Sequence, residues 1–172
     1  GLIKVADDRS LELTDEGRRR ATEVIRKHRL AERLLLDVIG LDRRLVHEEA
    51  CRWEHVMSEQ VEGRLASILD DVSTDPFGNP VPPQTAEPPR PSADEVSAER
   101  LASRETTTAV VSRIGEPIQA DAELIAALED AAITAGAQVE LRVSAGGVRL
   151  VGASGDPVVL SDDVARHLFV RR

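Results

Sequence analysis

Aromatic residues are scarce in this 172-residue sequence: they make up 2% of the chain, and tyrosine is absent. A single cysteine excludes an internal disulfide framework. No apolar run reaches membrane-spanning length, and no charged-then-apolar signal segment opens the chain. We therefore expect a cytoplasmic protein that does not contact a membrane, and whose thiol is a metal ligand, a nucleophile or a small buried hydrophobe.

An excess of positive charge is missing too. The net charge of −9 divides into −3 for residues 1–74 (13 basic, 16 acidic) and −6 for residues 75–172 (9 basic, 15 acidic). Neither part has the bulk electrostatics of a nucleic-acid binder. The hydrophobic content of 41% is enough for the core of one ordinary domain or of two small ones.

The N-terminal half reads as a hairpin followed by helices. Two short alternating runs within residues 1–14 predict a β-hairpin that is cut at its edge. Helical spacing of apolar residues, with Val38 facing inward and Gly40 as a stop, then predicts a long helix. The three helices expected in residues 15–74 cover residues 15–39, 43–57 and a segment from about residue 59.

The character of the sequence changes after residue 74. Seven of the nine prolines lie within residues 76–91, and the polar stretch up to residue 105 has little to bury, so residues 75–105 are predicted to be an extended linker. Residues 106–172 read as short strands with one helix, which is typical of a small barrel. The expected strands cover residues 108–113, 138–144, 147–152, 157–160 and 167–171, and the helix covers 122–134.

One stretch carries most of the chemistry. The only cysteine and two of the four histidines lie within nine residues, and in a helix His47, Cys51 and His55 would fall at i, i+4 and i+8, with Glu54 on the same side. Thiolate, imidazole and carboxylate together suit a divalent transition metal rather than calcium or magnesium, which prefer oxygen ligands. The sequence therefore predicts a metal-dependent function.

Several runs of this sequence closely resemble the diphtheria toxin repressor family, and in particular its actinobacterial iron-dependent regulators. The resemblance is dense over residues 1–80 and resumes at residue 113, so that only the linker lies outside it. The runs that carry it are Lys27–Leu35, Asp37–Leu41, His47–Ser58, Pro76–Pro80 and Arg113–Gln119.

The resemblance implies an α+β multidomain fold. Residues 1–14 would be the wing of a winged helix-turn-helix, 15–74 a helical dimerisation and metal-binding domain, and 106–172 an SH3-like domain. The implied function is repression of iron-uptake genes by a homodimer, with Fe²⁺ as corepressor and Mn²⁺, Co²⁺, Ni²⁺ or Zn²⁺ as substitutes in vitro. A manganese-responsive repressor is the alternative. Operator DNA is expected to bind the intact repressor and not this chain alone, because the recognition helix would precede residue 1.

Carried over residue by residue, the resemblance implies two metal sites. The primary site would use Cys51, Glu54 and His55, with a methionine from the DNA-binding domain that this sequence does not contain. The ancillary site would use His28, Glu32, His47, Glu116 and Gln119. Spacing agrees with the second set, since His28 and Glu32 share a helix face and Glu116 and Gln119 are three residues apart.

The resemblance also implies that an anion binds beside the ancillary metal. Arg29 and Asn79 match the residues that hold this anion, whereas Asp75 stands where the family usually has serine. A negatively charged side chain at that position is a departure from the family pattern.

Two other classes of metal-binding protein, hydrolases and storage proteins, could carry the same ligand types. His47, Glu48 and Cys51 are one substitution from a zincin motif, but a hydrolase keeps an open coordination position that the additional candidate ligands would fill. A metal-storage protein would not need the hairpin of residues 1–14. We therefore expect a regulator and not an enzyme.

Overall fold

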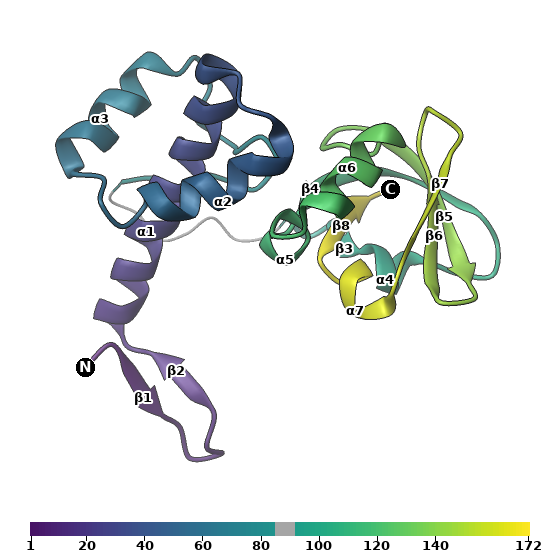
Figure 1. The fold of residues 1–172 in the computed structure, drawn as a ribbon. Coiled ribbons are helices and arrows are strands. Elements are labelled where there is room, and N and C mark those ends of the chain that lie inside the picture. Colours follow the sequence, from purple (N-terminus) through teal and green to yellow (C-terminus); the bar gives the residue numbers. More distant parts are fainter. Residues whose placement is uncertain (85–91) are drawn as a thin grey trace.

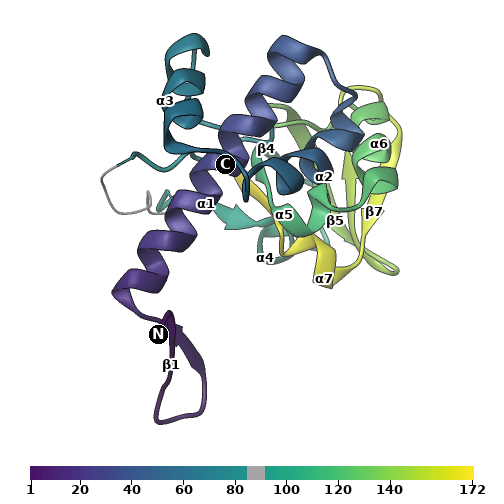
Figure 2. The ribbon, with the colours of Figure 1, turned by 60° about the vertical axis from the view of Figure 1, so that its left-hand side comes forward.

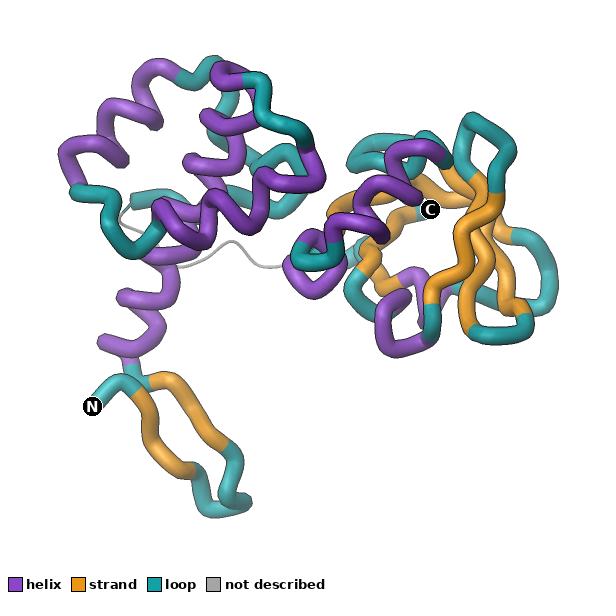
Figure 3. Tube along the Cα trace, in the orientation of Figure 1, coloured by secondary structure: helices purple, strands orange, loops and turns teal. Residues whose placement is uncertain are grey.

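The chain forms a helical unit beside a sheet domain in the computed structural model, which describes residues 1–84 and 92–172 (Figure 1). In Figure 3 the helices lie mainly in the N-terminal unit and the strands mainly in the C-terminal domain. The exceptions are the N-terminal hairpin and the short helices of the sheet domain. Among the described residues, no helix has the length and apolar character needed to cross a membrane. The helical unit consists of α1 (Asp15–Arg33), the π-helix η1 (Leu34–Ile39), α2 (Arg43–Trp53) and α3 (Glu59–Ile68).

The N-terminal hairpin projects from the start of α1. Strands β1 (Ile3–Val5) and β2 (Leu11–Leu13) pair antiparallel, and both views place them away from the other elements (Figures 1 and 2). All six strand residues are exposed, although most of them are apolar. Thr14 begins α1, because its Oγ1 accepts a hydrogen bond from the Gly17 backbone N–H at 3.1 Å.

The first long helix changes its geometry near its end. The sequence predicts one helix over residues 15–39, whereas the structure continues from α1 into η1 and ends at Gly40, whose φ is +74°. A π-helical turn contains an extra residue, which rotates the following side chains around the axis. Val38, predicted to face inward, is therefore 62% exposed.

The second helix is shorter than predicted. It ends at Trp53, whereas the sequence indicated residue 57, and a turn leads to the buried side chain of Met57. Ser58 then caps α3 by accepting a hydrogen bond from the Val61 N–H at 3.3 Å, with extended backbone angles of −74° and 158°. Because a cap residue is not helical, the chain has to leave α2 before residue 58.

The C-terminal domain is built on a six-stranded antiparallel sheet in the order β3-β8-β4-β5-β6-β7. Its helix α6 ends at Asp130 instead of residue 134. The chain order is β3 (Val96–Ser97), α4 (Ala98–Leu101), β4 (Thr107–Ile114), α5 (Glu116–Gln119), α6 (Ala122–Asp130), β5 (Gln138–Ser144), β6 (Gly147–Val151), β7 (Pro157–Leu160), α7 (Asp162–Ala165) and β8 (Leu168–Arg171).

The predicted linker is too long at its C-terminal end. Val96 and Ser97 pair with Val170 and Phe169 of β8, so β3 and α4 belong to the sheet domain. A two-residue strand and a four-residue helix show no apolar periodicity, which explains why the sequence pattern missed them. Part of the predicted linker, residues 85–91, lies outside the described residues.

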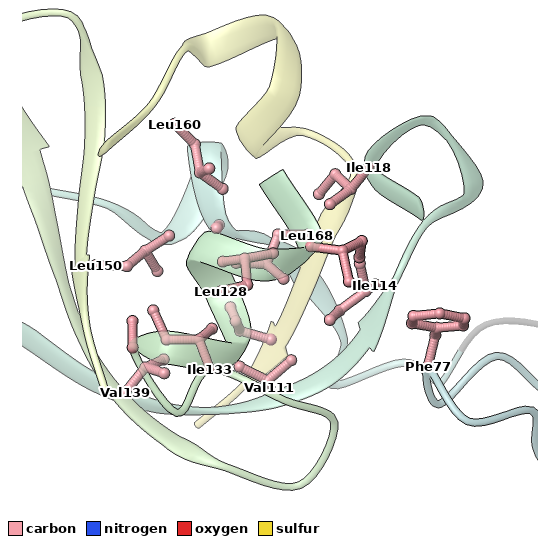
Figure 4. Packing of buried hydrophobic residues seen from close by; sticks show 14 of the residues in the cluster. Phe77, Val111, Ile114, Ile118, Leu128, Ile133, Val139, Leu150, Leu160 and Leu168 are labelled. Atoms are coloured by element: carbon pink, nitrogen blue, oxygen red, sulfur yellow. The ribbon is translucent and has the colours of Figure 1, made fainter. Parts of the chain in front are cut away.

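The other end of the predicted linker is attached to the sheet domain. Phe77 is fully buried and lies at the edge of the C-terminal core, near Ile114 and Ile118 (Figure 4). Gly78 has a φ of +86°, and a Cβ there would overlap the carbonyl oxygen of Ser112. The loop Asp75–Val81, called here the Phe77 loop, therefore joins the two domains by direct contact.

Candidate metal centre

Two helix faces meet where the candidate ligands lie. On α1, His28 and Glu32 are one turn apart, and on α2, His47 and Cys51 have the same spacing. The helices are in contact with each other, and Ala31, Val46 and Ala50 are completely buried in the core cluster. Local helix periodicity therefore brings four donor side chains to one junction.

His28 lies at the centre of this group. Its Nε2 is 2.9 Å from Glu32 Oε1 and 3.1 Å from His47 Nδ1, and His47 Nδ1 is 3.3 Å from the same Glu32 oxygen. The two imidazole rings are 4.8 Å apart at their centroids in an edge-to-face arrangement. Donor atoms of His28, His47 and Cys51 all lie within 4.8 Å of one another.

Burial and charge act in opposite directions on this cluster. Burial lowers the pKa of His28, but hydrogen bonds and charge from Glu32 and Glu54 outweigh it, so the pKa of His28 is raised. Burial raises the pKa of Glu32, but its bonds to His28 and His47 leave that pKa lowered. These opposite shifts favour a protonated His28 imidazole beside an ionised Glu32 carboxylate.

The predicted primary site is not assembled in this structure. Glu54 points to His28, with 2.7 Å between its Oε2 and the Nδ1 of His28. His55 follows the end of α2, its side chain is 69% exposed, and its Nε2 lies 3.1 Å from Glu54 Oε1. The helix face expected to carry His47, Cys51 and His55 is therefore broken before His55, because α2 ends at Trp53. Glu54 and His55 stay predicted ligands.

Cys51 faces the other predicted site. Its Sγ is 3.7 Å from His47 Nε2. Burial, followed by the charges of Glu54, Glu32 and Glu116, raises the pKa of the thiol. Cys51 is therefore a thiol near neutral pH until a cation offsets the surrounding carboxylates.

The C-terminal domain contributes the short helix α5, which lies against α2. Glu116 is half-exposed, and its Oε1 lies 3.6 Å from Arg29 Nη2. Gln119 is buried and donates from Nε2 to the Ile114 carbonyl at 2.6 Å. The predicted ligands Glu116 and Gln119 therefore come from an element next to the two helix faces.

The candidate anion position is occupied by a carboxylate of the chain itself. The Asn79 amide donates to Asp75 Oδ2 and to the Ile114 carbonyl, both at 2.9 Å. Arg29 lies with its Nε 3.6 Å from Asp75 and also donates to the Pro80 carbonyl. Burial, and then the charge of Glu32, raises the pKa of Asp75 to about 7. Anion binding by Arg29 and Asn79 stays a prediction.

The side chains present fit a divalent transition metal. Among the residues that the structure describes, Glu32 Oε2 and Gln119 Oε1 are buried acceptors without a hydrogen-bond partner. A buried acceptor without a partner is costly unless a cation or a donor satisfies it. Two imidazoles, a thiol and several carboxylates are donors that Fe²⁺ and its neighbours accept.

Comparison with known families covers most of the chain. Residues 14–83 match the family model described as iron dependent repressor, metal binding and dimerisation domain, and residues 97–172 match the diphtheria toxin repressor SH3 domain. The chain belongs to the iron-dependent repressor family. This confirms the resemblance seen in the sequence, and with it the fold class of a helical metal-binding and dimerisation domain plus an SH3-like domain.

Similar proteins include the iron-dependent repressor IdeR of Mycobacterium tuberculosis, 45% identical over all of this chain and 77% of the relative. The diphtheria toxin repressor of Corynebacterium glutamicum is 47% identical over all of this chain and 76% of its own length. A solved manganese-dependent transcriptional repressor in complex with manganese has a TM-score of 0.82 and 27% identity, covering 99% of this chain and 78% of that one.

Membership of this family decides between the classes weighed from the sequence. The relatives are named as transcriptional repressors and not as enzymes, so the expectation of a regulator is confirmed and the hydrolase reading is set aside. Metal-dependent repression is the function that the family members share in their printed names.

Sequence reasoning missed residues that support the site without resembling ligands. The Ile114 carbonyl accepts from both Asn79 and Gln119, and a backbone oxygen leaves no signal in a sequence. Arg43 reaches across to the C-terminal domain from the first turn of α2. Its spacing of four residues from His47 was the one signal that could have indicated it.

Proposed function

We propose that this protein is an Fe²⁺-dependent transcriptional repressor of iron uptake and homeostasis genes, with the metal as corepressor and a homodimer as the working unit. The observation that carries the proposal is the buried cluster of His28, Glu32 and His47 beside α5 of the C-terminal domain. Operator DNA is the partner of the intact protein, which would act in the cytoplasm.

The ancillary site of this proposal is held by His28, Glu32 and His47 together with Glu116 and Gln119. The unpartnered Oε2 of Glu32 and Oε1 of Gln119, each judged among the described residues, support these assignments. A metal shared by α1, α2 and α5 would add a bond between the helical unit and the C-terminal domain, which stabilises their contact.

The primary site would use Cys51, Glu54 and His55. Glu54 would have to exchange its contact with His28 for the metal, and the exposed His55 ring would have to turn toward it. The 69% exposure of the His55 side chain after the end of α2 supports this, because its ring has room to turn. Metal binding at this site would favour the arrangement in which Glu54 and His55 both turn toward the metal with Cys51.

Iron is preferred over manganese in this proposal because of the sulfur ligand. Thiolate and imidazole suit iron, whereas manganese favours carboxylate, carbonyl and water. Relatives of about 45% identity are named for iron, while solved structures of 20–27% identity are named for manganese. A manganese-responsive repressor is the second candidate, since solved relatives of this fold bind that metal.

Exposed apolar side chains of the helical unit support a dimer, because a second copy of the chain could bury them. Val38 and Ile39 of η1 and Val61 and Ile68 of α3 are each at least half exposed. They lie in the part of the chain that matches a dimerisation domain. We expect Ile68→Asp to shift the protein toward monomer in sedimentation at micromolar concentration, whereas Val159→Asp in the other domain leaves the dimer intact.

Calorimetric titration with Fe²⁺ tests the metal assignment, using reduced protein without oxygen. Two separable events are expected, one lost in Cys51→Ala and the other in His28→Ala. His167→Ala is the matched control, because His167 lies in the C-terminal domain outside the cluster. If neither variant changes the titration, or if no metal binds at micromolar concentration, the proposed ligands are wrong.

Repression itself is tested with genomic DNA. Fragments of the source genome are selected with the intact protein, with and without Fe²⁺. We expect metal-dependent recovery of fragments upstream of iron-uptake genes. Equal recovery in the presence of a chelator would contradict the role of metal as corepressor.

A further inference from the structure

Arg43 lies on the same face of α2 as two candidate ligands. Arg43, His47 and Cys51 are successive turns apart, so this face runs from the metal cluster to the first residue of the helix. Asp42 caps the helix by accepting a hydrogen bond from the Arg44 N–H at 3.0 Å, which fixes where α2 begins. The helix thus holds Arg43 at a set distance from the cluster.

The Arg43 side chain contacts two segments beyond the helical unit. Its Nε lies 3.0 Å from Glu129 Oε1 near the end of α6, and its Nη1 donates to the Pro76 carbonyl at 2.9 Å. Its guanidinium carbon is 5.5 Å from the centroid of the Phe77 ring. One planar cation therefore touches α6 and the Phe77 loop at once.

These contacts are stronger than an ordinary surface ion pair. The Arg43 side chain is 23% exposed, and the aromatic ring beneath it is completely buried. A guanidinium held by a carboxylate, a carbonyl and an aromatic face uses its planar shape in a way that a lysine ammonium does not. The orientation of α6 relative to α2 is thus constrained by a side chain that is no candidate ligand.

The Phe77 loop continues these contacts to the ligand Gln119. The Phe77 carbonyl accepts a hydrogen bond from the Ile114 N–H at 2.8 Å, and the Ile114 carbonyl accepts one from Gln119 Nε2 at 2.6 Å. The second amide hydrogen bond to that carbonyl comes from Asn79 in the same loop. With Nε2 held in this way, the buried Oε1 is the atom of Gln119 that stays available as a ligand.

We propose that Arg43 is a positioning residue that holds the C-terminal domain against α2 before metal binds, so that Glu116 and Gln119 already face His28, Glu32 and His47. The inference rests on the proposed function, since it assigns Glu116 and Gln119 to a metal. All of the Arg43 contacts are with protein groups, so the arrangement does not depend on a metal for its bonds.

The first test is amide hydrogen exchange of the full, metal-free chain. Arg43→Ala should speed exchange roughly tenfold in segment 75–81, which loses direct contacts of about 1.4 kcal/mol, and to a similar degree in 114–120, which that loop supports through the Ile114 N–H. Arg44→Ala is the matched control, since Arg44 is exposed and its ion pair is with Asp42, so the variant removes one charge near Glu129 without removing a contact to the Phe77 loop. Equal exchange in Arg43→Ala and Arg44→Ala would overturn the proposal.

The second test is titration of the same proteins with Co²⁺, whose visible absorption reports coordination. Arg43→Ala should weaken the event that is lost in His28→Ala roughly tenfold and change the event lost in Cys51→Ala less than twofold. The charge exchange Arg43→Glu with Glu129→Arg should recover part of this loss. A purely structural role would weaken both events alike and would not be recovered, which would overturn the proposal.

The two hypotheses fail differently. If wild-type protein binds no metal, the proposed function fails and the role of Arg43 toward ligands fails with it, whatever the exchange rates. If wild type shows both events and Arg43→Ala matches it, only the positioning role fails.

Discussion

The Nδ1 atom of His28 lies 2.7 Å from Glu54 Oε2, so a residue predicted for the ancillary site bonds a residue predicted for the primary site. This contact uses the same imidazole whose Nε2 lies 2.9 Å from Glu32. One imidazole is therefore bonded by a residue of each predicted site, Glu32 and Glu54. Loading one site should alter the other, because Glu54 is free for a metal only after it leaves His28.

Metal binding should release protons. Burial raises the pKa of the Cys51 thiol above its ordinary range, so at neutral pH the thiol would bind metal only after losing a proton, and the raised pKa of His28 would add to the release. We expect on the order of one proton or more released at pH 7, and tighter binding as the pH rises. Calorimetry in two buffers of different ionisation enthalpy measures the number. Release that is unchanged in Cys51→Ala would rule out the thiol as the source.

The stability of the metal-free protein should fall between about pH 4 and pH 7 through Asp75. Burial and the charge of Glu32 raise the pKa of this carboxyl to about 7, well above its value in the unfolded chain. The folded state therefore binds the proton more tightly, and stability present below about pH 4 is lost as the pH rises through the folded pKa.

Asp75→Asn checks this by urea unfolding at pH 5 and pH 8. The free energy of unfolding of the variant minus that of wild type should be larger at pH 8 than at pH 5. The increase should be a few kcal/mol at most, since one pKa unit corresponds to about 1.4 kcal/mol. A stability difference that is the same at both pH values would contradict the assignment.

Metal binding by the wild-type protein should be insensitive to phosphate. Asn79 gives its side-chain amide to Asp75 and Ile114, and Arg29 faces the carboxylates of Asp75 and Glu116, so an external anion would meet negative charge. Asp75→Ser removes that charge, and its metal affinity should rise several-fold when phosphate is added. The measurement is a Co²⁺ titration of both proteins with and without roughly millimolar phosphate, since a weak anion site fills only when the free anion concentration exceeds its Kd. A phosphate effect on wild type would show that Asp75 does not take the place of an anion.

Phe77→Ala should destabilise the protein by about 3–5 kcal/mol, as expected for a completely buried aromatic ring. The loss should be largest in the C-terminal domain, because the Phe77 ring packs at the edge of that domain's core. Denaturant unfolding measures it, with Val159→Ala as a control at a half-exposed position of the same domain. A change below about 1 kcal/mol would mean that the loop packs more weakly than the structure indicates.

The sequence was sufficient for those parts of the site that depend on helix periodicity. His28 with Glu32, and His47 with Cys51, are each four residues apart, and a helix places such pairs on one face whatever it packs against. Recognition of the family supplied the fold class and the distant pair Glu116 and Gln119.

What the sequence could not give depends on tertiary structure or on local breaks in a helix. The exposure of His55 follows from the end of α2 at Trp53, two residues before it, whereas the sequence pattern continued to residue 57. The contact between His28 and Glu54 joins residues 26 positions apart, and no spacing rule predicts it. Asp75 was seen as a departure from the family pattern, but its complete burial against Arg29 follows from the packing of the Phe77 loop.

The close approach of Gly78 to Ser112 has a consequence for how this protein can tolerate changes in length. Because the chain is already fastened to the C-terminal domain at the Phe77 loop, the separation of the domains is set before Val81. Residues inserted at the exposed Pro83 and Gln84 would leave those contacts in place and would cost mainly the slowly growing entropy of a longer connection, about 0.6 kcal/mol for each doubling of its length. A single residue added between Asp75 and Val81 would displace Asn79 from the Ile114 carbonyl. The candidate ligand Gln119 donates to the same carbonyl, so its position would change too.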